Sequence, residues 1–298
     1  MNNAIFKTLP MILPDQDGAI FNGKIFRFGA GGKGSVYSVD AIYAAEGSDN
    51  VPVQPIAGVQ LDRADVIVPH CNAVVFGTEY AEPGDEYPLL YANIYNNYQK
   101  CDERLEGTAC VYRLWQDAEG YHTKLMQIIR VGFVGDLSLW TSKPDRGDVR
   151  PYGNFVVERE KNRLWAFTMR DADRTTRYFA FRLPKLGEGV FSKTYGVNVV
   201  TLGKDDILKQ FDCEYSCYIQ GACCENGMIV SVEGFSDEHH PAKMQVIDLE
   251  AGKQALAVDL RGRGMTIEPE FCDFADTPNG RRLIYSDGHG AIFEVTFE

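Results

Sequence analysis

The chain has 298 residues, of which 45% are hydrophobic and 24% are charged, and its formal net charge is -12 with a pI near 5.0. This composition is typical of a globular protein and argues against extensive disorder. The acidic balance repels nucleic-acid phosphates and anionic membrane surfaces, so we expect neither as a partner.

The N-terminal segment carries no targeting or membrane signal. Residues 1–18, MNNAIFKTLPMILPDQDG, lack the basic leader and the long apolar region of a secretory signal, and no run in the chain approaches the roughly 20 apolar residues of a membrane helix. We therefore expect a cytoplasmic protein; removal of a leader from a longer precursor is the alternative. The eight cysteines follow no disulfide-framework spacing, which predicts reduced thiols in strand interiors.

Short segments rich in Val, Ile, Phe and Tyr recur between Gly, Asn and Asp residues, which predicts an almost all-β protein. QDGAIFNGKIFRFG (Gln16–Gly29) and QGACCENGMIVSVEG (Gln220–Gly234) each place Asn-Gly six residues after Gln, a pattern that predicts strand, tight turn and strand. Later, VYRLWQDAEG, YFAFRLPKLGEG and MQVIDLEAGK each end a predicted third strand at a glycine-containing turn before a fourth strand. KDDILKQF (Lys204–Phe211) is the one segment with a helical pattern.

Four strands per unit, repeated around a ring, define the blade of a β-propeller. Five units cover the chain as one domain, residues 1–298, and begin near Gln16, His70, Pro151, Tyr218 and Glu268. A six-bladed ring is the alternative, if the long second unit, Leu61–Val134, contains two blades. The last unit supplies three strands, so we predict that Ala4–Pro10 becomes its fourth strand and closes the ring.

At the level of architecture, the whole chain resembles the β-propeller superfamily. One segment, IQGACCENGMIVSVEGF followed by VIDLEAGKQALAVDL, is similar to a blade of the five-bladed glutaminyl cyclotransferase-type propellers, which carry Gln-Gly, a turn and Asp-x-x-x-Gly in similar order. That resemblance spans about one blade, so it implies a fold and no activity. The sequence shows no Trp-Asp blade endings, Kelch Gly-Gly pairs or Asp-box repeats.

Polar residues precede the innermost strand in every predicted unit and would surround one mouth of the central channel. The predicted channel-mouth ligand residues are Asp17, His70, Asn72, Arg150, Asn154, Gln220, Glu268 and Glu270, with Gln16 beside them. Carboxylates near a histidine and an arginine suit acid–base chemistry if burial moves their pKa values toward neutrality. Hydration of a water-filled channel is the alternative explanation for the same polarity.

A Tyr- and Asn-rich segment in the second unit, LLYANIYNNYQKCDERLEG, continues into a long polar loop. Asn96, Asn97 and Tyr98 are the predicted loop ligand residues, because Tyr and Asn side chains on a loop can stack on and hydrogen-bond to a sugar or peptide. Tyr91 and Tyr95 have strand spacing, so we expect them to pack between blades instead.

Three other motifs favour structural roles. The adjacent His239 and His240 fall in a predicted solvated turn, and the Cys213/Cys217 and Cys223/Cys224 pairs lack a second ligand pair at zinc spacing. The glycine-rich Gly29–Gly34 joins two strands, which favours a hairpin over a phosphate-binding loop.

Two classes of function fit these residues. We favour a binding protein for a polar small molecule, a carbohydrate or a protein partner at the channel mouth, and we expect no cofactor and no metal. The alternative is an enzyme, a hydrolase, lyase or acyl-type transferase, with Asp17, Glu268 or Glu270 as its acid or base.

Overall fold

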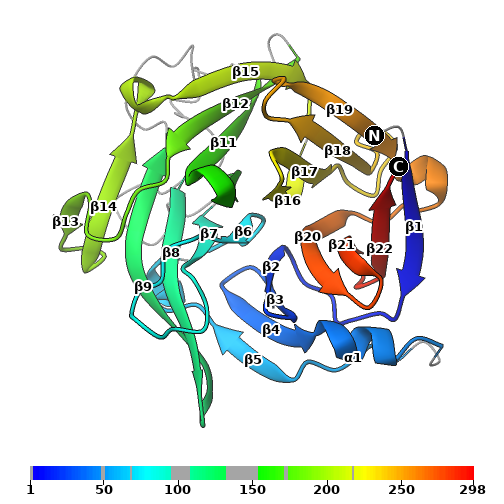
Figure 1. Cartoon of the computed structure of the whole chain (residues 1–298), viewed down its shortest axis with the longest axis horizontal. Helices are drawn as coiled ribbons and strands as arrows, with labels where there is room; N and C mark the ends of the chain where they lie inside the picture. Colours follow the sequence, from blue (N-terminus) through cyan, green and yellow to red (C-terminus); the bar gives the residue numbers. More distant parts are fainter. Residues whose placement is uncertain are drawn as a thin grey trace.

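The computed structural model describes residues 3–47, 51–67, 69–94, 108–131, 154–170, 174–216 and 218–298. The described strands form five sheets arranged in a ring around a central axis (Figure 1). The chain is therefore a five-bladed β-propeller, as predicted. The six-bladed alternative is wrong, because the strands of the second unit belong to a single sheet.

Each blade is built on four antiparallel strands, to which the second blade adds two more, and its first strand lies nearest the centre of the ring (Figure 1). The first blade consists of β2 (Gly18–Phe21), β3 (Lys24–Phe28), β4 (Lys33–Ser38) and β5 (Ala57–Gln60). The second consists of β6 (Val74–Phe76), β7 (Leu90–Ile94), β8 (Thr108–Asp117) and β9 (Gly120–Val131). The third consists of β10 (Phe155–Glu158), β11 (Arg163–Arg170), β12 (Thr175–Arg182) and β15 (Lys209–Glu214). The fourth consists of β16 (Ile219–Glu225), β17 (Met228–Glu233), β18 (Lys243–Asp248) and β19 (Lys253–Asp259).

The fifth blade joins the two ends of the described chain. It consists of β20 (Pro269–Thr277), β21 (Gly280–Asp287), β22 (Ile292–Phe297) and the N-terminal strand β1 (Ala4–Leu9). β1 runs antiparallel to β22, with Ala4 opposite Phe297 and Leu9 opposite Ile292. The predicted ring closure is confirmed by this pairing, and the edge of β22 is covered.

Tight turns at Asn-Gly pairs shape two of the hairpins. Asn22 and Gly23 have φ of 46° and 67°, and Asn226 and Gly227 have φ of 52° and 71°. Two successive left-handed residues match the twist of the flanking strands, which explains why Asn-Gly marks both positions. The glycine-rich segment Gly29–Gly34 also joins two strands, β3 and β4, as predicted.

The third blade departs from the sequence prediction. The strand that follows the turn of YFAFRLPKLGEG is not the fourth strand of its own blade: β13 (Val190–Ser192) and β14 (Val197–Leu202) extend the second blade to six strands. β14 lies parallel to β9. Its alternate residues Val197 and Val199 pack on the cores of the first two blades, while Val200 and Leu202 face the core of the third, so both faces of the added strand are covered.

Helices also differ from the prediction. The predicted helical segment Lys204–Phe211 is helical only as the 3₁₀ turn η3 (Lys204–Asp206), and β15 begins at Lys209. Helix α1 (Val39–Ala44), missed from the sequence, begins where the Ser38 side chain accepts a hydrogen bond from Ala41 N at 3.4 Å. The remaining short elements are α2 (Ala64–Ile67), η2 (Arg159–Lys161) and η4 (Arg261–Arg263). None of the helices in the described ranges is long and apolar enough to span a membrane.

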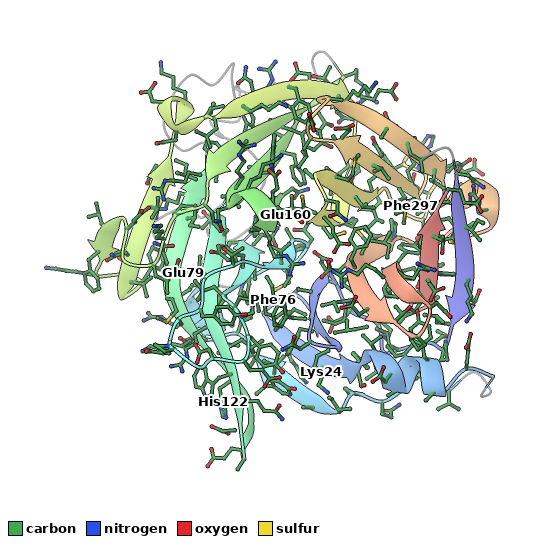
Figure 2. The ribbon with its side chains drawn as sticks, viewed as in Figure 1. Lys24, Phe76, Glu79, His122, Glu160 and Phe297 are labelled. Atoms are coloured by element: carbon green, nitrogen blue, oxygen red, sulfur yellow. The ribbon has the colours of Figure 1, made fainter. Side chains whose placement is uncertain are left out.

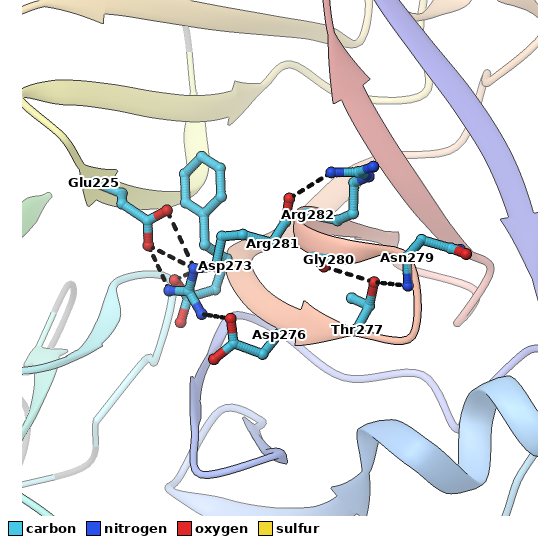
Figure 3. Close-up of polar contacts among 9 residues, drawn as sticks. Glu225, Asp273, Asp276, Thr277, Asn279, Gly280, Arg281 and Arg282 are labelled. Atoms are coloured by element: carbon cyan, nitrogen blue, oxygen red, sulfur yellow. Dashed lines mark hydrogen bonds and ion pairs between the residues drawn. The ribbon is translucent and has the colours of Figure 1, made fainter.

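Side chains fill the space between blades (Figure 2). Hydrogen bonds near the channel fix the position of neighbouring blades relative to each other. Asp17 Oδ2 accepts from Val74 N of the next blade at 2.9 Å, and Asp273 Oδ2 accepts from Ile20 N at 2.6 Å. Between the fourth and fifth blades, Arg281 Nε donates to Glu225 Oε2 at 2.9 Å (Figure 3). Tyr91, predicted to pack between blades, is fully buried; Tyr95 lies outside the described residues.

The cysteine prediction has a direct solution test. The described cysteines 71, 110, 213, 223, 224 and 272 are buried free thiols, and burial raises the pKa of Cys110 to about 12 and that of Cys213 to about 11. Because the thiolate is the reactive form, we expect these six to resist alkylation in the native protein and to react without reductant after denaturation. Intact-mass measurement of the alkylated protein checks this; a mass showing an intact disulfide would contradict it.

Candidate functional site

A cavity of about 330 Å³ opens at one mouth of the central channel, and residues from all five blades line it. The lining residues are Gln16, His70, Asn72, Asn154, Tyr218, Ile219, Gln220, Phe235, Glu268 and Glu270. These residues are far apart in the chain but meet at the channel mouth. Most of them precede or begin the innermost strand of a blade, and Phe235 follows the second strand of its blade.

Most of the residues predicted to surround the channel mouth meet in this cavity. His70, Asn72, Asn154, Gln220, Glu268 and Glu270 all line it. Asp17 does not line the cavity. It is fully buried, and its Oδ2 atom accepts from Val74 N, so it links two neighbouring blades. Arg150 and the loop residues Asn96, Asn97 and Tyr98 lie outside the described residues.

Two β-bulges aim side chains into the cavity. The pairing of β16 with β17 shifts between Ile219 and Gly221, and the pairing of β20 with β21 shifts between Pro269 and Phe271. Gln220 and Glu270 are therefore the extra residues of equivalent bulges in neighbouring blades. A bulge breaks the strand's alternation and can redirect a side chain, which explains how strand residues come to line the channel mouth.

Glutamines from neighbouring blades hold the two carboxyl groups of the cavity. Gln220 Nε2 donates to Glu268 Oε1, and Gln16 Nε2 donates to Glu270 Oε1 at 3.3 Å. Burial, together with the negative charge of Glu268, raises the pKa of Glu270 to about 8. Burial also raises the pKa of Glu268 from its ordinary value. Glu270 is consequently mostly a neutral carboxylic acid at pH 7.

Hydrogen bonds hold the two asparagine side chains of the cavity. Asn154 Nδ2 donates to Ile219 O of the next blade at 3.2 Å. Asn72 N donates to Asn93 Oδ1 at 3.0 Å, and Asn93 Nδ2 donates back to Asn72 Oδ1. Burial lowers the pKa of His70, so its ring is neutral at pH 7.

A buried arginine lies behind the carboxyl groups. Arg27 is fully buried; its Nε donates to Gln16 O at 2.8 Å and its Nη2 to Asp15 O at 2.7 Å. Its guanidinium carbon lies 4.9 Å from the ring centroid of Phe271. Its positive charge opposes the rise in the pKa of Glu270 that burial causes. Arg27 thus supports the floor of the site without lining it.

An aromatic group forms one side of the cavity. The rings of Tyr218 and Phe235 lie 4.3 Å apart between centroids, and His240 meets the Tyr218 ring edge-on at 5.0 Å. Tyr218 is 38% exposed. The loop that carries Phe235 and His240 is folded on itself, since Phe235 N donates to His240 O at 2.7 Å and Asp237 Oδ1 accepts from His240 N at 2.7 Å.

Tyr218 and Phe235 were not predicted as site residues. The available signal was weak: Tyr218 begins a unit, and Phe235 follows Gly234, whose φ of 96° turns the chain after β17 toward the channel. Adjacent His239 and His240 were expected in a solvated turn. Both lie in a bend, where His239 is exposed as expected; the partly exposed His240 also contributes its ring to the aromatic group, which the sequence pattern did not indicate.

The cavity offers carboxyl, amide, imidazole and aromatic groups for binding. In the part of the chain that the structure describes, no cluster of three or more His, Cys, Asp or Glu side chains is placed to hold a metal ion. Glu270 combines a raised pKa with a neighbouring carboxyl group, an arrangement found in binding sites and in acid–base sites.

Comparisons with known proteins identify no family for the chain. No protein-family model matches it, and no curated protein matches it in sequence. The WD40 β-propeller domain of Doa1 is 13% identical over 95% of this chain and 78% of that chain, with a TM-score of 0.38. Sqt1 of Saccharomyces cerevisiae is 7% identical over 98% of this chain and 58% of its own, with a TM-score of 0.37. Hydrazine synthase of Kuenenia stuttgartiensis is 10% identical over 91% of this chain and 61% of its own, with a TM-score of 0.40.

The chain is a β-propeller by its own strand pairing, and a polar cavity lies at its channel mouth. The structural neighbours are too distant for their functions to be carried over. The local resemblance to glutaminyl cyclotransferase-type propellers gains no support from the family search.

Proposed function

We propose that this propeller binds a small polar molecule in the cavity at its channel mouth. The observation that carries the proposal is the state of Glu270: its side chain lines the cavity, is 5% exposed, and leaves Oε2 without a hydrogen-bond partner in the described residues. A buried polar atom without a partner destabilises the fold, and a bound ligand would supply the missing contact. Amide, carboxyl and aromatic groups in one cavity also suit a carbohydrate.

The substitution Glu270→Gln should separate binding from stability. Because the pKa of Glu270 is about 8 in the folded state, above its ordinary value of 4.5, ionisation of this carboxyl opposes folding increasingly between those two pH values. Removing it should leave stability unchanged at low pH and raise it by about 2–4 kcal/mol above pH 8. Denaturant unfolding across this pH range measures the gain.

Glu270→Gln should weaken ligand binding, although it raises stability. In ligand-observed NMR with a library of sugars, polyols, amino acids and amines, molecules bound by the native protein should be lost or weakened in Glu270→Gln. Glu250→Gln, which removes an exposed carboxyl at the β18–β19 turn, is the matched control and should leave binding unchanged. Unchanged binding in Glu270→Gln, or no binding by the native protein, would contradict a site at the mouth.

An enzyme is the second candidate, and the same residue favours it. A carboxylic acid that stays neutral at pH 7 can donate a proton, and Glu268 beside it can carry charge, a pairing suited to a hydrolase, lyase or acyl-type transferase. Turnover of a bound library member that falls as pH rises through about 8, and that Glu270→Gln abolishes, would select the enzyme. Binding without turnover would select the binding protein.

A protein partner and a cytoplasmic location complete the proposal. The channel mouth with the segment containing Asn96, Asn97 and Tyr98 would form a surface for a protein or peptide. The buried free thiols support a reducing compartment. The net charge of -12 disfavours nucleic acid as a partner.

A further inference from the structure

The charged groups of the cavity have one sign. Its acidic lining residues are Glu268 and Glu270, and neither Lys nor Arg lines it in the described residues. His70 adds no positive charge at pH 7, because burial lowers its pKa. The buried Arg27 does not line the cavity: its Nε and Nη2 atoms donate to Gln16 O and Asp15 O, and its Nη1 atom has no hydrogen-bond partner in the described residues.

The aromatic side of the cavity is tied to the acidic side. Glu268 N donates to Ser236 Oγ at 2.9 Å, and Ser236 directly follows Phe235. Tyr218 and Phe235 lie 4.3 Å apart between ring centroids on the same cavity wall. An aromatic pair beside two carboxyl groups is the arrangement that recognises an organic ammonium group, because ring faces attract cations and carboxylates pair with them.

We propose that the ligand of the channel mouth carries a cationic amine or quaternary ammonium group, placed between the Tyr218/Phe235 wall and the carboxyl groups of Glu268 and Glu270. This inference rests on the proposed function and specifies its ligand class. Glu270 lines the cavity and its Oε2 atom has no hydrogen-bond partner in the described residues, so a cation would stabilise the negative charge of this carboxyl group. Neutral sugars could hydrogen-bond to the amide and carboxyl groups, but they would gain no charge pairing with the two acidic groups.

Binding of such a cation should be coupled to release of a proton. Glu270 is mostly protonated at pH 7, whereas a cation favours its ionised form, so affinity should rise with pH up to about 8 and then level off. The charged and titratable groups around Glu270 are Glu268 on the same segment, Asp15 and Arg27 from the first blade, Tyr285 from β21, and His70 across the cavity. Of these, Glu268 also has a raised pKa, so its ionisation would likewise increase the affinity for a cation as the pH rises.

The test compares choline with its neutral isostere 3,3-dimethyl-1-butanol, which has the same shape and no charge. Choline should bind at least about tenfold more tightly than the isostere. Choline keeps its charge at every pH, so a rise in its affinity between about pH 6 and about pH 9 reports the protein's own carboxyl groups. Calorimetry in buffers of different ionisation enthalpy measures the released proton.

Variants assign the contribution of each wall. Phe235→Leu should weaken choline binding about five- to thirtyfold, and Glu268→Gln should weaken it about tenfold or more. Glu250→Gln is the matched control and should bind choline as the native protein does. Thermal unfolding of each variant confirms that it is folded.

The outcomes separate this inference from the proposed function. Equal binding of choline and its isostere, or no binding of choline, overturns the cationic ligand. If neutral sugars then bind and lose affinity in Glu270→Gln, the mouth remains a binding site for another ligand class. If neither cations nor neutral molecules bind there, both proposals fall.

Discussion

Deleting residues 1–10 is expected to lower the stability of the propeller by at least about 5 kcal/mol. The deletion removes β1, whose Leu9 is 4% exposed and whose Phe6 ring meets Tyr285 and Phe293 at 6.3 Å and 6.5 Å between centroids. Burial of one large apolar side chain contributes about 1.5–3 kcal/mol, and the ladder with β22 is lost as well. For a chain of this size, the melting temperature should fall by about 10 °C or more.

The deletion also exposes the edge of β22, so the shortened protein should self-associate, as size-exclusion chromatography would show. A peptide spanning Ala4–Pro10, added in trans, should restore part of the lost stability by pairing with β22. Deletion of residues 1–2 alone is the control and should leave the melting temperature unchanged. An unchanged melting temperature after removal of residues 1–10 would show that β1 does not close the ring.

The blade pattern could be predicted because strand periodicity and turn chemistry are local. The predicted unit starts lie within four residues of the innermost strands, as at Gln16 before β2 and Tyr218 before β16. The addition of β14 to the second blade could not be predicted in this way. It depends on parallel pairing with β9, between residues about 70 positions apart in the chain, and local patterns contain no information about such partners.

The polar residues of the site could be predicted, while their geometry could not. Ring symmetry alone brings His70, Asn154 and Glu268 to one mouth, so their positions before innermost strands were sufficient. The bulges at Gln220 and Glu270 insert one residue into a strand that otherwise reads as regular. Phe235 follows a strand rather than preceding one, and the assumption that site residues precede innermost strands therefore missed it.

Replacing Arg27 with Met is expected to cost about 3–5 kcal/mol of stability, because it removes the buried cation among the carboxyl groups behind the cavity. Negative charge on Asp15, Asp17 and Glu270 favours the charged guanidinium, whereas burial opposes it. Without it, Gln16 O and Asp15 O lose their donors, and the pKa of Glu270 should rise further because the opposing charge is gone. The affinity of the channel mouth for a cationic ligand should fall, because Glu270 would be ionised less often.

The destabilisation should be larger at pH 7 than at pH 4, because low pH protonates Asp15, whose carboxylate the variant leaves without a counter-charge, whereas Glu270 is already mostly neutral at pH 7. Urea unfolding at both pH values measures this difference. Arg263→Met is the matched control: Arg263 also lies over an aromatic ring, with its guanidinium carbon 5.5 Å from the centroid of Phe6, but it is exposed. Its loss should cost less than about 1 kcal/mol. Two results would contradict this prediction: equal effects of the two substitutions, or an Arg27→Met protein as stable as the native one. Either would mean that the buried charge of Arg27 does not stabilise the contact between the first and fifth blades and does not support Glu270.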